Sequence, residues 1–174
     1  MIKTILVPTD GSDHANKATT LAADIAEKYG ARLVVLHVMS RGPLPEAWRH
    51  MAEVEHVVEP TASSMAGIPT ANIPTTKGPS ELAGGNRTRE VLEFVGRKVL
   101  SAAEDIAKHK GVKNYATALE EGSPVKRILD LADKEDANLI VMGSRGLTDF
   151  NGLLMGSVSH KISHLAKCTC ITVK

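Results

Sequence analysis

The chain has 174 residues, with 21 lysines and arginines against 20 aspartates and glutamates, so its formal net charge is +1. This balance gives no indication of nucleic acid or of an anionic membrane as a partner. No apolar run approaches the roughly 18 residues needed to cross a bilayer. Residues 1–4 lead directly into an apolar segment, without room for a signal peptide. We therefore expect a cytoplasmic protein of one domain, long enough to bury a sizeable core.

The first forty residues predict a strand, a helix and a second strand. Residues 4–7 form a short apolar run typical of a buried strand, and residues 8–12 (Pro-Thr-Asp-Gly-Ser) have turn chemistry. Apolar spacing predicts a helix over about 13–29 that ends at Gly30. Its core-facing residues are expected to be Ala18, Leu21, Ala22, Ile25 and Tyr29. Residues 33–38 predict the second buried strand.

Residues 41–86 differ in composition from the rest of the chain. Six of the eight prolines lie between Pro43 and Pro79. The spacing of Ala47, Met51, Val54 and Val58 allows one short amphipathic helix at the front of this stretch. Residues 60–86 show no periodicity and are expected to form a long mobile loop. The stretch is too short and too poor in large apolar residues for a second domain, so we predict an insertion within one domain and leave its role open.

The remaining elements again alternate between helix and strand. A helix is predicted over about 87–109, with Val91, Val95, Val99, Ala102 and Ile106 on its core face. Residues 115–119 predict a weak strand. Ser123 and Pro124 are typical of the N-cap and first residue of a helix whose core-facing residues are Val125, Ile128, Leu129 and Ala132. A strand over 139–142, a helix with Val158, Ile162 and Leu165 on its core face, and a strand over 168–173 follow.

This alternation predicts an α/β fold: a doubly wound, five-stranded parallel sheet with helices on both faces. The first, second and fourth strands are continuously apolar and should be central, whereas the third and fifth should lie at the edges, which gives the order 3-2-1-4-5. In such a sheet, ligands bind beyond the carboxyl ends of the strands where the chain reverses direction, here between strands one and four. Residues 8–12 and 143–146 would border that crevice, with Asp10 beside the glycine loop.

The residues after the fourth strand carry the clearest functional pattern. Gly143 and Gly146 allow a sharp turn and a close approach of the backbone to a ligand. Gly156 and Ser157 open the last helix, with Ser157 expected as its N-cap. Exposed amides and the positive end of a helix dipole favour a phosphate, and the hydroxyls of Ser157 and Ser159 could add hydrogen bonds. A loop that merely turns the chain is the alternative, but three glycines, a capping serine and a buried strand coincide here.

The spacing Gly143-x2-Gly146-x9-Gly156-Ser157 resembles the nucleotide-binding pattern of the universal stress protein family, in its ATP-binding branch. Residues 5–12 (Ile-Leu-Val-Pro-Thr-Asp-Gly-Ser) look like the first strand and loop of that family. The resemblance covers both ends of the chain well and the middle loosely. It implies ATP as the ligand, the strand order given above and a homodimer through the last strand. The candidate ligand-binding residues are Pro8, Thr9, Asp10, Val38, Met142, Gly143, Arg145, Gly146, Gly156, Ser157, Val158 and Ser159.

Asp10 could accept hydrogen bonds from ribose hydroxyls or help hold Mg²⁺ on the nucleotide phosphates. Its alternative is an Asx-type turn residue, and the two roles can coexist. The resemblance implies that the backbone of Val38 meets the adenine edge and that Met142 packs near the nucleotide, although both could be plain core residues. Arg145 could reach a phosphate or stay solvated.

Several common nucleotide-binding and catalytic motifs are missing from the sequence. It contains no P-loop lysine, no Rossmann Gly-x-Gly-x-x-Gly and no nucleophile elbow. No residue of the motif is an obvious base to activate water. The pattern therefore favours an ATP-binding regulatory or stress-response module, which signals through its dimer or a regulatory protein partner, over a slow ATPase or phosphotransferase using the same site. Whether ATP is turned over stays open.

Two pairs of side chains are interpreted as structural. Cys168 and Cys170 stand two residues apart on a strand and point to the same face, which indicates packing rather than a disulfide or metal site. His160 and His164 have a helical spacing that can hold zinc, but no third ligand is evident, so we expect solvated histidines. Residues 168–173 would form an apolar edge strand, and such an edge favours pairing with a second copy.

Overall fold

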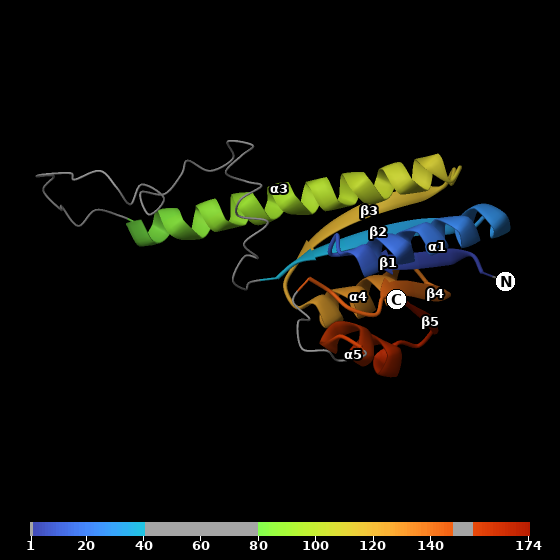
Figure 1. Cartoon of the computed structure of the whole chain (residues 1–174). Helices are drawn as coiled ribbons and strands as arrows, with labels where there is room; N and C mark the ends of the chain where they lie inside the picture. The colour runs from blue at the N-terminus through green and yellow to red at the C-terminus, as the bar shows by residue number, and fades with distance from the viewer. Residues whose placement is uncertain (1, 41–79, 148–154) are drawn as a thin grey trace, which may run out of the picture. The chain divides into compact units, whose positions relative to one another are not determined.

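The computed structural model of the chain describes residues 2–40, 80–147 and 155–174, with the backbone alone for residues 80–88 (Figure 1). The chain divides into two units, Met1–Pro43 with Gly96–Lys174, and Leu44–Val95. All strands and the candidate site lie in the first, which we call the core unit. Of the second unit, only the helical residues 80–95 are described, so the single-domain organisation stays a prediction.

Five strands and four helices make up the described part of the chain. In order they are β1 (Thr4–Pro8), α1 (Asp13–Tyr29), β2 (Arg32–Met39), α3 (Ser80–His109), β3 (Tyr115–Glu121), α4 (Pro124–Lys134), β4 (Leu139–Gly143), α5 (Ser157–Leu165) and β5 (Thr169–Val173). The strands form one parallel sheet in the order β3-β2-β1-β4-β5. The predicted fold class and strand order are therefore confirmed.

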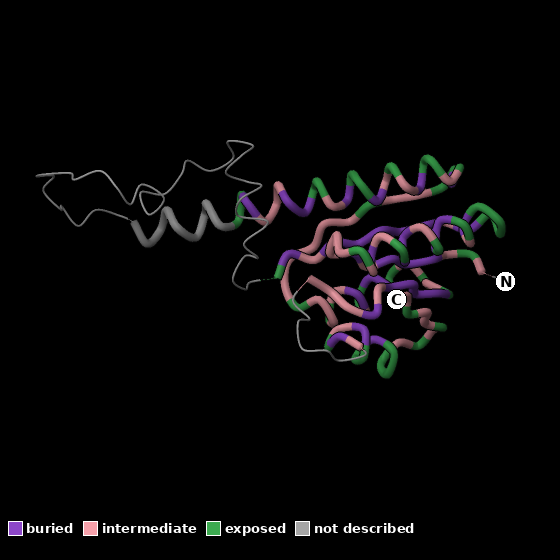
Figure 2. The backbone as a smooth tube through the Cα atoms, in the orientation of Figure 1, coloured by how far each residue is buried: buried purple, intermediate pink, exposed green. Residues whose placement is uncertain are grey.

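The sheet carries a hydrophobic core on each face. On one face, α1 and the end of α3 pack against Ile5, Val7, Leu33, Val35, Leu139 and Val141. On the other face, α4 and α5 pack against Leu6, Val34, Leu36, Ile140 and Met142. Buried residues run along β1, β2 and β4, whereas β3 and β5 are partly exposed (Figure 2). Strands buried on both faces hold the centre, as their continuous apolar runs predict.

α1 begins and ends where the sequence predicts. Ser12 is the N-cap, its Oγ accepting a hydrogen bond from Ala15 N at 3.3 Å, and Gly30 ends the helix with a φ of 62°. The predicted core face was wrong in part, because Leu21 is 37% and Tyr29 is 53% exposed. Ala18 and Ala22 are buried as predicted, and the other buried residues of the helix are also small: Ala15, Thr19, Ala23 and Ala26. Small side chains let helix and sheet approach closely, and the larger side chains lie at the flanks.

α3 begins at Ser80, so residues 80–86 are helical where a mobile loop was predicted. The two glycines at positions 84 and 85 argued against a helix in this segment, since glycine is a poor helix former. Residues 41–79, including the predicted front helix and the rest of the loop, lie outside the described residues. Further along α3, Leu100, Ala103 and Ala107 face the core, and Ala102 is exposed, contrary to prediction.

α4 and α5 cover the other face of the sheet. Ser123 is the N-cap of α4 and Pro124 its first residue, as predicted. Leu165 is 59% exposed rather than core-facing, because α5 ends there and Ala166 turns extended toward β5. Across the described residues, we find no helix of the length and apolar character that a membrane crossing requires.

Candidate functional site

The carboxyl ends of β1 and β4 lie side by side, because these two strands pair in parallel. β1 ends at Pro8 and β4 at Gly143. The chain continues from them as two loops, residues 9–12 and 144–147, which we call the crevice loops. This end of the sheet is where the strand order reverses, and ligands of such folds bind there. The structure therefore brings together the two loops that the sequence predicts.

Asp10 connects the two crevice loops. Its Oδ1 accepts a hydrogen bond from Ser12 N at 3.0 Å, and its Oδ2 accepts one from Leu147 N at 2.9 Å. Ser12 Oγ adds a longer bond to the carbonyl oxygen of Arg145 at 3.4 Å. The bond to Ser12 is the Asx-type turn considered from the sequence. The bond to Leu147, which the sequence does not predict, crosses from the loop of β1 to the loop of β4.

A second set of contacts holds the β4 loop to the start of α5. The carbonyl oxygen of Ser144 accepts hydrogen bonds from Gly156 N at 2.7 Å and from Ser159 Oγ at 2.9 Å. The Ser159 hydroxyl is buried and directs its proton to protein carbonyls, since Gly156 O is also 3.0 Å away. Gly156, in extended conformation, is the N-cap of α5, and Ser157 is its first residue. The predicted N-cap was therefore wrong by one residue.

Two of the motif glycines have a steric reason within the protein itself. A Cβ added at Gly143 would lie 2.8 Å from Ala15 N and 2.9 Å from the carbonyl carbon of His14, in the first turn of α1. A Cβ added at Gly146 would lie 2.6 Å from Asp10 Oδ2. Neither glycine has a positive φ. The spacing interpreted as ligand-facing is thus also a packing requirement between β4, its loop and the neighbouring elements.

The other predicted binding residues lie at or beneath the same end of the sheet. Thr9 is buried and donates its N–H to Leu36 O at 2.8 Å. Val38 and Met142 belong to the core on the α4–α5 face. Arg145 is partly exposed in the β4 loop, and Val158 lies in the first turn of α5. Which of these residues contact a ligand stays a prediction.

A model of the universal stress protein family matches residues 1–174. This chain belongs to the universal stress protein family. Universal stress protein YxiE of Bacillus subtilis (strain 168) is 33% identical over 174 residues, covering 100% of both chains. A Thermus aquaticus protein, "Universal stress protein in QAH/OAS sulfhydrylase 3'region", is 31% identical, again over 174 residues and 100% of both chains. The family resemblance of the sequence is therefore confirmed.

Solved universal stress proteins share the fold of the chain. One from Archaeoglobus fulgidus aligns with a TM-score of 0.63 at 24% identity, covering 100% of this chain and 95% of that one. A universal stress protein in complex with cAMP aligns with a TM-score of 0.60 at 23% identity (99% and 96% covered). A structure of a universal stress protein from Archaeoglobus fulgidus in complex with dAMP gives 0.57 at 20% identity (100% and 98% covered). At these identities the likeness shows the fold alone.

The sequence interpretation missed a buried histidine beneath the crevice loops of this universal stress protein. His37 in β2 is 2% exposed, and its Nδ1 donates to the carbonyl oxygen of Thr9 at 2.8 Å. Burial lowers the pKa of His37, against the opposing effects of the Thr9 hydrogen bond and the charge of Asp10. The only signal in the sequence is a polar residue within an otherwise apolar strand.

Acidification should destabilise the fold through His37. Because burial lowers its pKa in the folded state, the unfolded chain takes up the proton first as the pH falls below 6.5, and stability is lost from there down through the folded-state pKa. One proton limits the loss to about 1.4 kcal/mol per pH unit. His37→Asn keeps a donor for Thr9 O but does not titrate, so its unfolding free energy, from urea denaturation across this range, should fall less than that of wild type. The exposed His109→Asn is the control, and equal pH slopes for His37→Asn and wild type would contradict the assignment.

The pair His160 and His164 and the pair Cys168 and Cys170 lie at the surface or the sheet edge of the universal stress protein. His160 and His164 are exposed, as predicted, with ring centroids 4.7 Å apart. Among the residues that the structure describes, no three His, Cys, Asp or Glu side chains are grouped to hold a metal ion. Cys168 and Cys170 are free thiols that pack beside the core on the α4–α5 face, as predicted, and burial raises the pKa of both.

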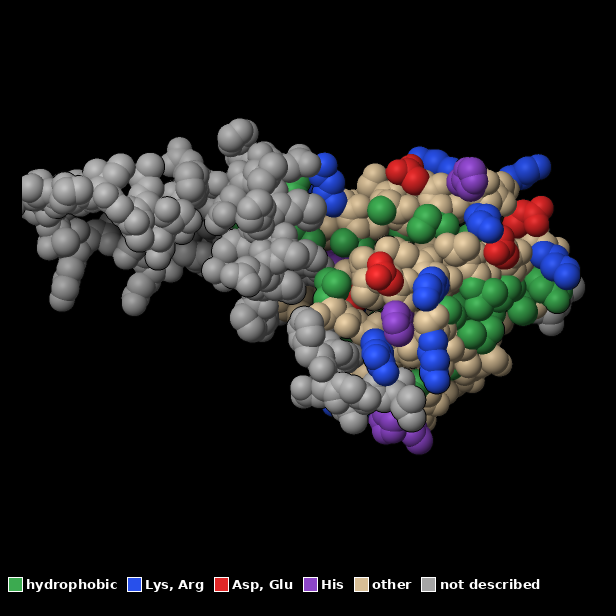
Figure 3. Space-filling model, in the orientation of Figure 1, with side chains coloured by type: hydrophobic (Ala, Val, Ile, Leu, Met, Phe, Trp, Pro, Cys, Tyr) green, Lys and Arg blue, Asp and Glu red, His purple; other side chains and the backbone are tan. Residues whose placement is uncertain are grey.

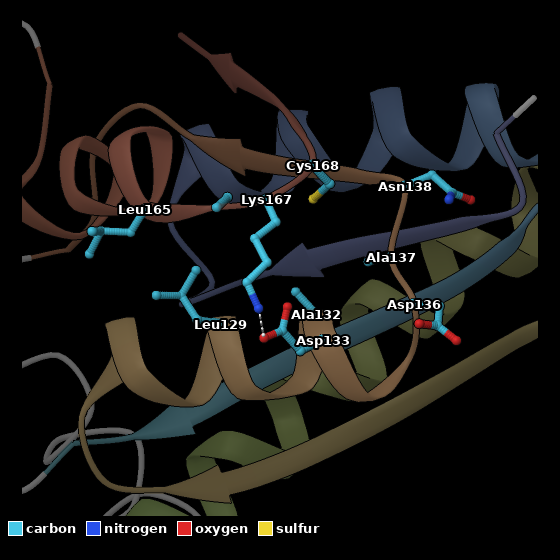
Figure 4. Close-up of a pocket in the computed structure, with 10 residues that line it drawn as sticks. Leu129, Ala132, Asp133, Asp136, Ala137, Asn138, Leu165, Lys167 and Cys168 are labelled. Atoms are coloured by element: carbon cyan, nitrogen blue, oxygen red, sulfur yellow. Dashed lines mark hydrogen bonds and ion pairs between the residues drawn. The ribbon is translucent and has the colours of Figure 1, made fainter.

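A pocket of about 400 Å³ opens between α4 and α5 at the opposite end of the sheet (Figure 4). Lys167 Nζ lies 2.7 Å from Asp133 Oδ2 within it. The other residues of its lining are Leu129, Ala132, Asp136, Ala137, Asn138, Leu165, Ala166 and Cys168. Residues 137–138 precede β4 and residues 167–168 precede β5, so this pocket lies at the amino ends of the strands. It is therefore separate from the crevice where the fold predicts a ligand.

Proposed function

We propose that this universal stress protein binds an adenine nucleotide, ATP, at the crevice loops and acts as a nucleotide-dependent, dimeric regulator of a stress response in the cytoplasm. The observation that carries this proposal is the bond between Asp10 and Leu147, which joins the loops of β1 and β4 where the strand order reverses. Two solved relatives of the same fold, the complexes with cAMP and with dAMP, support an adenine nucleotide as the ligand.

The proposed contacts follow from the positions of the residues in the fold. Val38, near the end of β2, would meet the adenine edge through its backbone. Arg145, Gly146 and Ser157 would meet the phosphates, and the positive end of the α5 dipole would add to the attraction. Asp10 would meet the ribose or a phosphate-bound Mg²⁺ with the lone pairs that its amide partners leave over.

A second candidate function is slow turnover of ATP, by hydrolysis or phosphoryl transfer at the same site. One contact favours it: His14 Nδ1 lies 3.0 Å from Ser144 Oγ, the separation of a base and a hydroxyl nucleophile. Against it, Ser144 is buried at 3% exposure, and residues 8–12 and 143–147 contain no lysine. We therefore favour the regulator. Phosphate release, measured with and without a protein partner, separates the two functions.

We propose that the dimer forms through β5. Among the described strands, β5 pairs only with β4. Ser144 N donates to Val173 O at 2.7 Å, so the backbone groups of Val173 point toward β4. Those of Cys170 and Thr172 then point to the outer edge, since successive residues of a strand alternate sides. Hydrophobic side chains gather on the face of the core unit seen in Figure 3. Leu21 of α1, the helix that contacts β5, is 37% exposed. Such an edge favours a second copy as partner.

Replacing Arg145 by alanine should weaken ATP binding by about 5- to 30-fold, because the loss of one charged hydrogen bond to a phosphate costs about 1–2 kcal/mol. Titration calorimetry with ATP and Mg²⁺ measures the change, and a repeat with EDTA shows whether the metal contributes. Lys28→Ala removes the same charge from the last turn of α1, at the amino ends of the strands, and should bind as wild type does. Unchanged affinity in Arg145→Ala, or an equal loss in Lys28→Ala, would contradict the proposed site.

A further inference from the structure

We propose that Asp10 is a positioning residue, which holds the β4 crevice loop in its binding shape before a nucleotide arrives. We call the contacts of Asp10 with residues 12, 146 and 147 the latch. The latch is a property of the protein alone, whereas its consequence for affinity rests on the proposed nucleotide function.

Both oxygens of Asp10 are committed to backbone groups. Oδ1 accepts from Ser12 N at 3.0 Å and so fixes the carboxylate on its own loop. Oδ2 accepts from Leu147 N at 2.9 Å and so fixes the loop of β4. Hydrogen bonds to an ionised carboxylate are stronger than those between neutral groups. The Asp10 side chain therefore ties the two crevice loops together, beside the longer bond from Ser12 Oγ to the carbonyl oxygen of Arg145.

Gly146 is the second half of the latch. A Cβ at this position would stand 2.6 Å from Asp10 Oδ2 and 3.7 Å from its Cγ, and the first distance is too short for any real contact. The space beside Gly146 is therefore taken by the carboxylate of Asp10, without any ligand. A glycine at position 146 follows from the aspartate at position 10, so the two positions are coupled energetically.

The latch has a distinct consequence for ligands. A loop that is ordered in advance lowers the entropy cost of binding the part of the ligand that it contacts. In the proposed complex that part is the phosphate chain, so losing the latch should lower the affinity for ATP much more than the affinity for adenosine. If Asp10 acted only by accepting hydrogen bonds from ribose hydroxyls, its loss would lower both affinities by the same factor.

The latch itself is tested on the ligand-free protein with a double-mutant cycle of wild type, Asp10→Ala, Gly146→Ala and the double variant, beside the controls Asp13→Ala and Asp10→Asn. Asp10→Ala should speed hydrogen exchange of the Leu147 amide by about tenfold or more, while the exposed Asp13→Ala leaves it unchanged. Gly146→Ala should lower the melting temperature clearly in wild type but little in Asp10→Ala, where the carboxylate is gone. Asp10→Asn keeps the volume of the side chain, so Gly146→Ala should remain harmful in that background.

The consequence is tested by calorimetry of wild type and Asp10→Ala with ATP and with adenosine. We expect a loss of about tenfold for ATP and a smaller one for adenosine. If wild type binds neither, the proposed nucleotide function is wrong, while the exchange and coupling data still decide the latch. The latch would be overturned by unchanged exchange of Leu147 in Asp10→Ala, or by an equal cost of Gly146→Ala in both backgrounds. Equal losses for adenosine and ATP would overturn the positioning role of Asp10 in nucleotide binding.

Discussion

Replacing Gly143 by alanine should lower the free energy of unfolding by about 3 kcal/mol. The added Cβ would lie 2.8 Å from Ala15 N and 2.9 Å from the carbonyl carbon of His14. Both are backbone atoms of α1, so no side-chain rotation can relieve the contact. α1 would have to move away from β4, and the closely packed alanines on its buried face would lose their contacts with the sheet.

Gly30→Ala is the matched control for this variant. Gly30 has a φ of 62°, but a Cβ added there would meet no heavy atom within 4 Å. Its replacement should therefore cost only the strain of the left-handed conformation, about 1 kcal/mol. Urea denaturation of the two variants beside wild type measures both costs. A Gly143→Ala protein as stable as Gly30→Ala would show that β4 and α1 are not in the close contact described.

Thr172→Pro should convert the proposed dimer into a folded monomer. The backbone N–H of Thr172 points to the outer edge of β5, so proline removes a donor from the interface without removing a bond to β4. The missing donor and the bulk of the ring should cost about 3 kcal/mol, which raises the dissociation constant by about 100-fold or more. Light scattering after size-exclusion chromatography, over a range of protein concentrations, measures the dissociation.

Two controls protect the interpretation of the dimer test. Thr172→Ala keeps the backbone donor and should remain dimeric. At protein concentrations low enough for wild type to dissociate, Thr172→Pro should melt at the same temperature as wild type, which would show that its sheet is intact. A folded Thr172→Pro dimer of wild-type affinity would place the interface elsewhere. A wild-type protein that stays monomeric at high concentration would end the dimer proposal.

The strand order could be predicted because burial leaves a pattern in residue types. A run such as Ile5-Leu6-Val7, apolar at every position, is typical of a central strand in a sheet that helices cover on both faces. β1 is indeed buried on both faces. Helical spacing carried less information. Leu21 and Tyr29 were expected in the core because their spacing places them on one face of the helix, whereas the contact between α1 and the sheet is so close that alanines occupy it.

The candidate site could be predicted as a place but not as a set of contacts. The predicted strand order, which the family resemblance also implies, put Asp10 beside the glycine loop. Its bond to Leu147 uses a backbone amide, which every residue except proline has, so the sequence carries no sign of it. The sequence also does not reveal the steric reason for Gly146. A glycine that makes room for a carboxylate of the protein cannot be distinguished in the sequence from one that makes room for a phosphate.

The most direct test of nucleotide binding at the crevice is the mapping of backbone amide shifts by NMR as ATP and Mg²⁺ are added to the isotope-labelled full chain. We expect the largest changes in residues 9–12, 144–147 and 156–159, at the carboxyl ends of β1 and β4. Small or no changes are expected in the pocket between α4 and α5, at the other end of the sheet. Changes centred on Asp136, Asn138, Lys167 and Cys168 in that pocket, or no changes at saturating ATP, would contradict the proposed function.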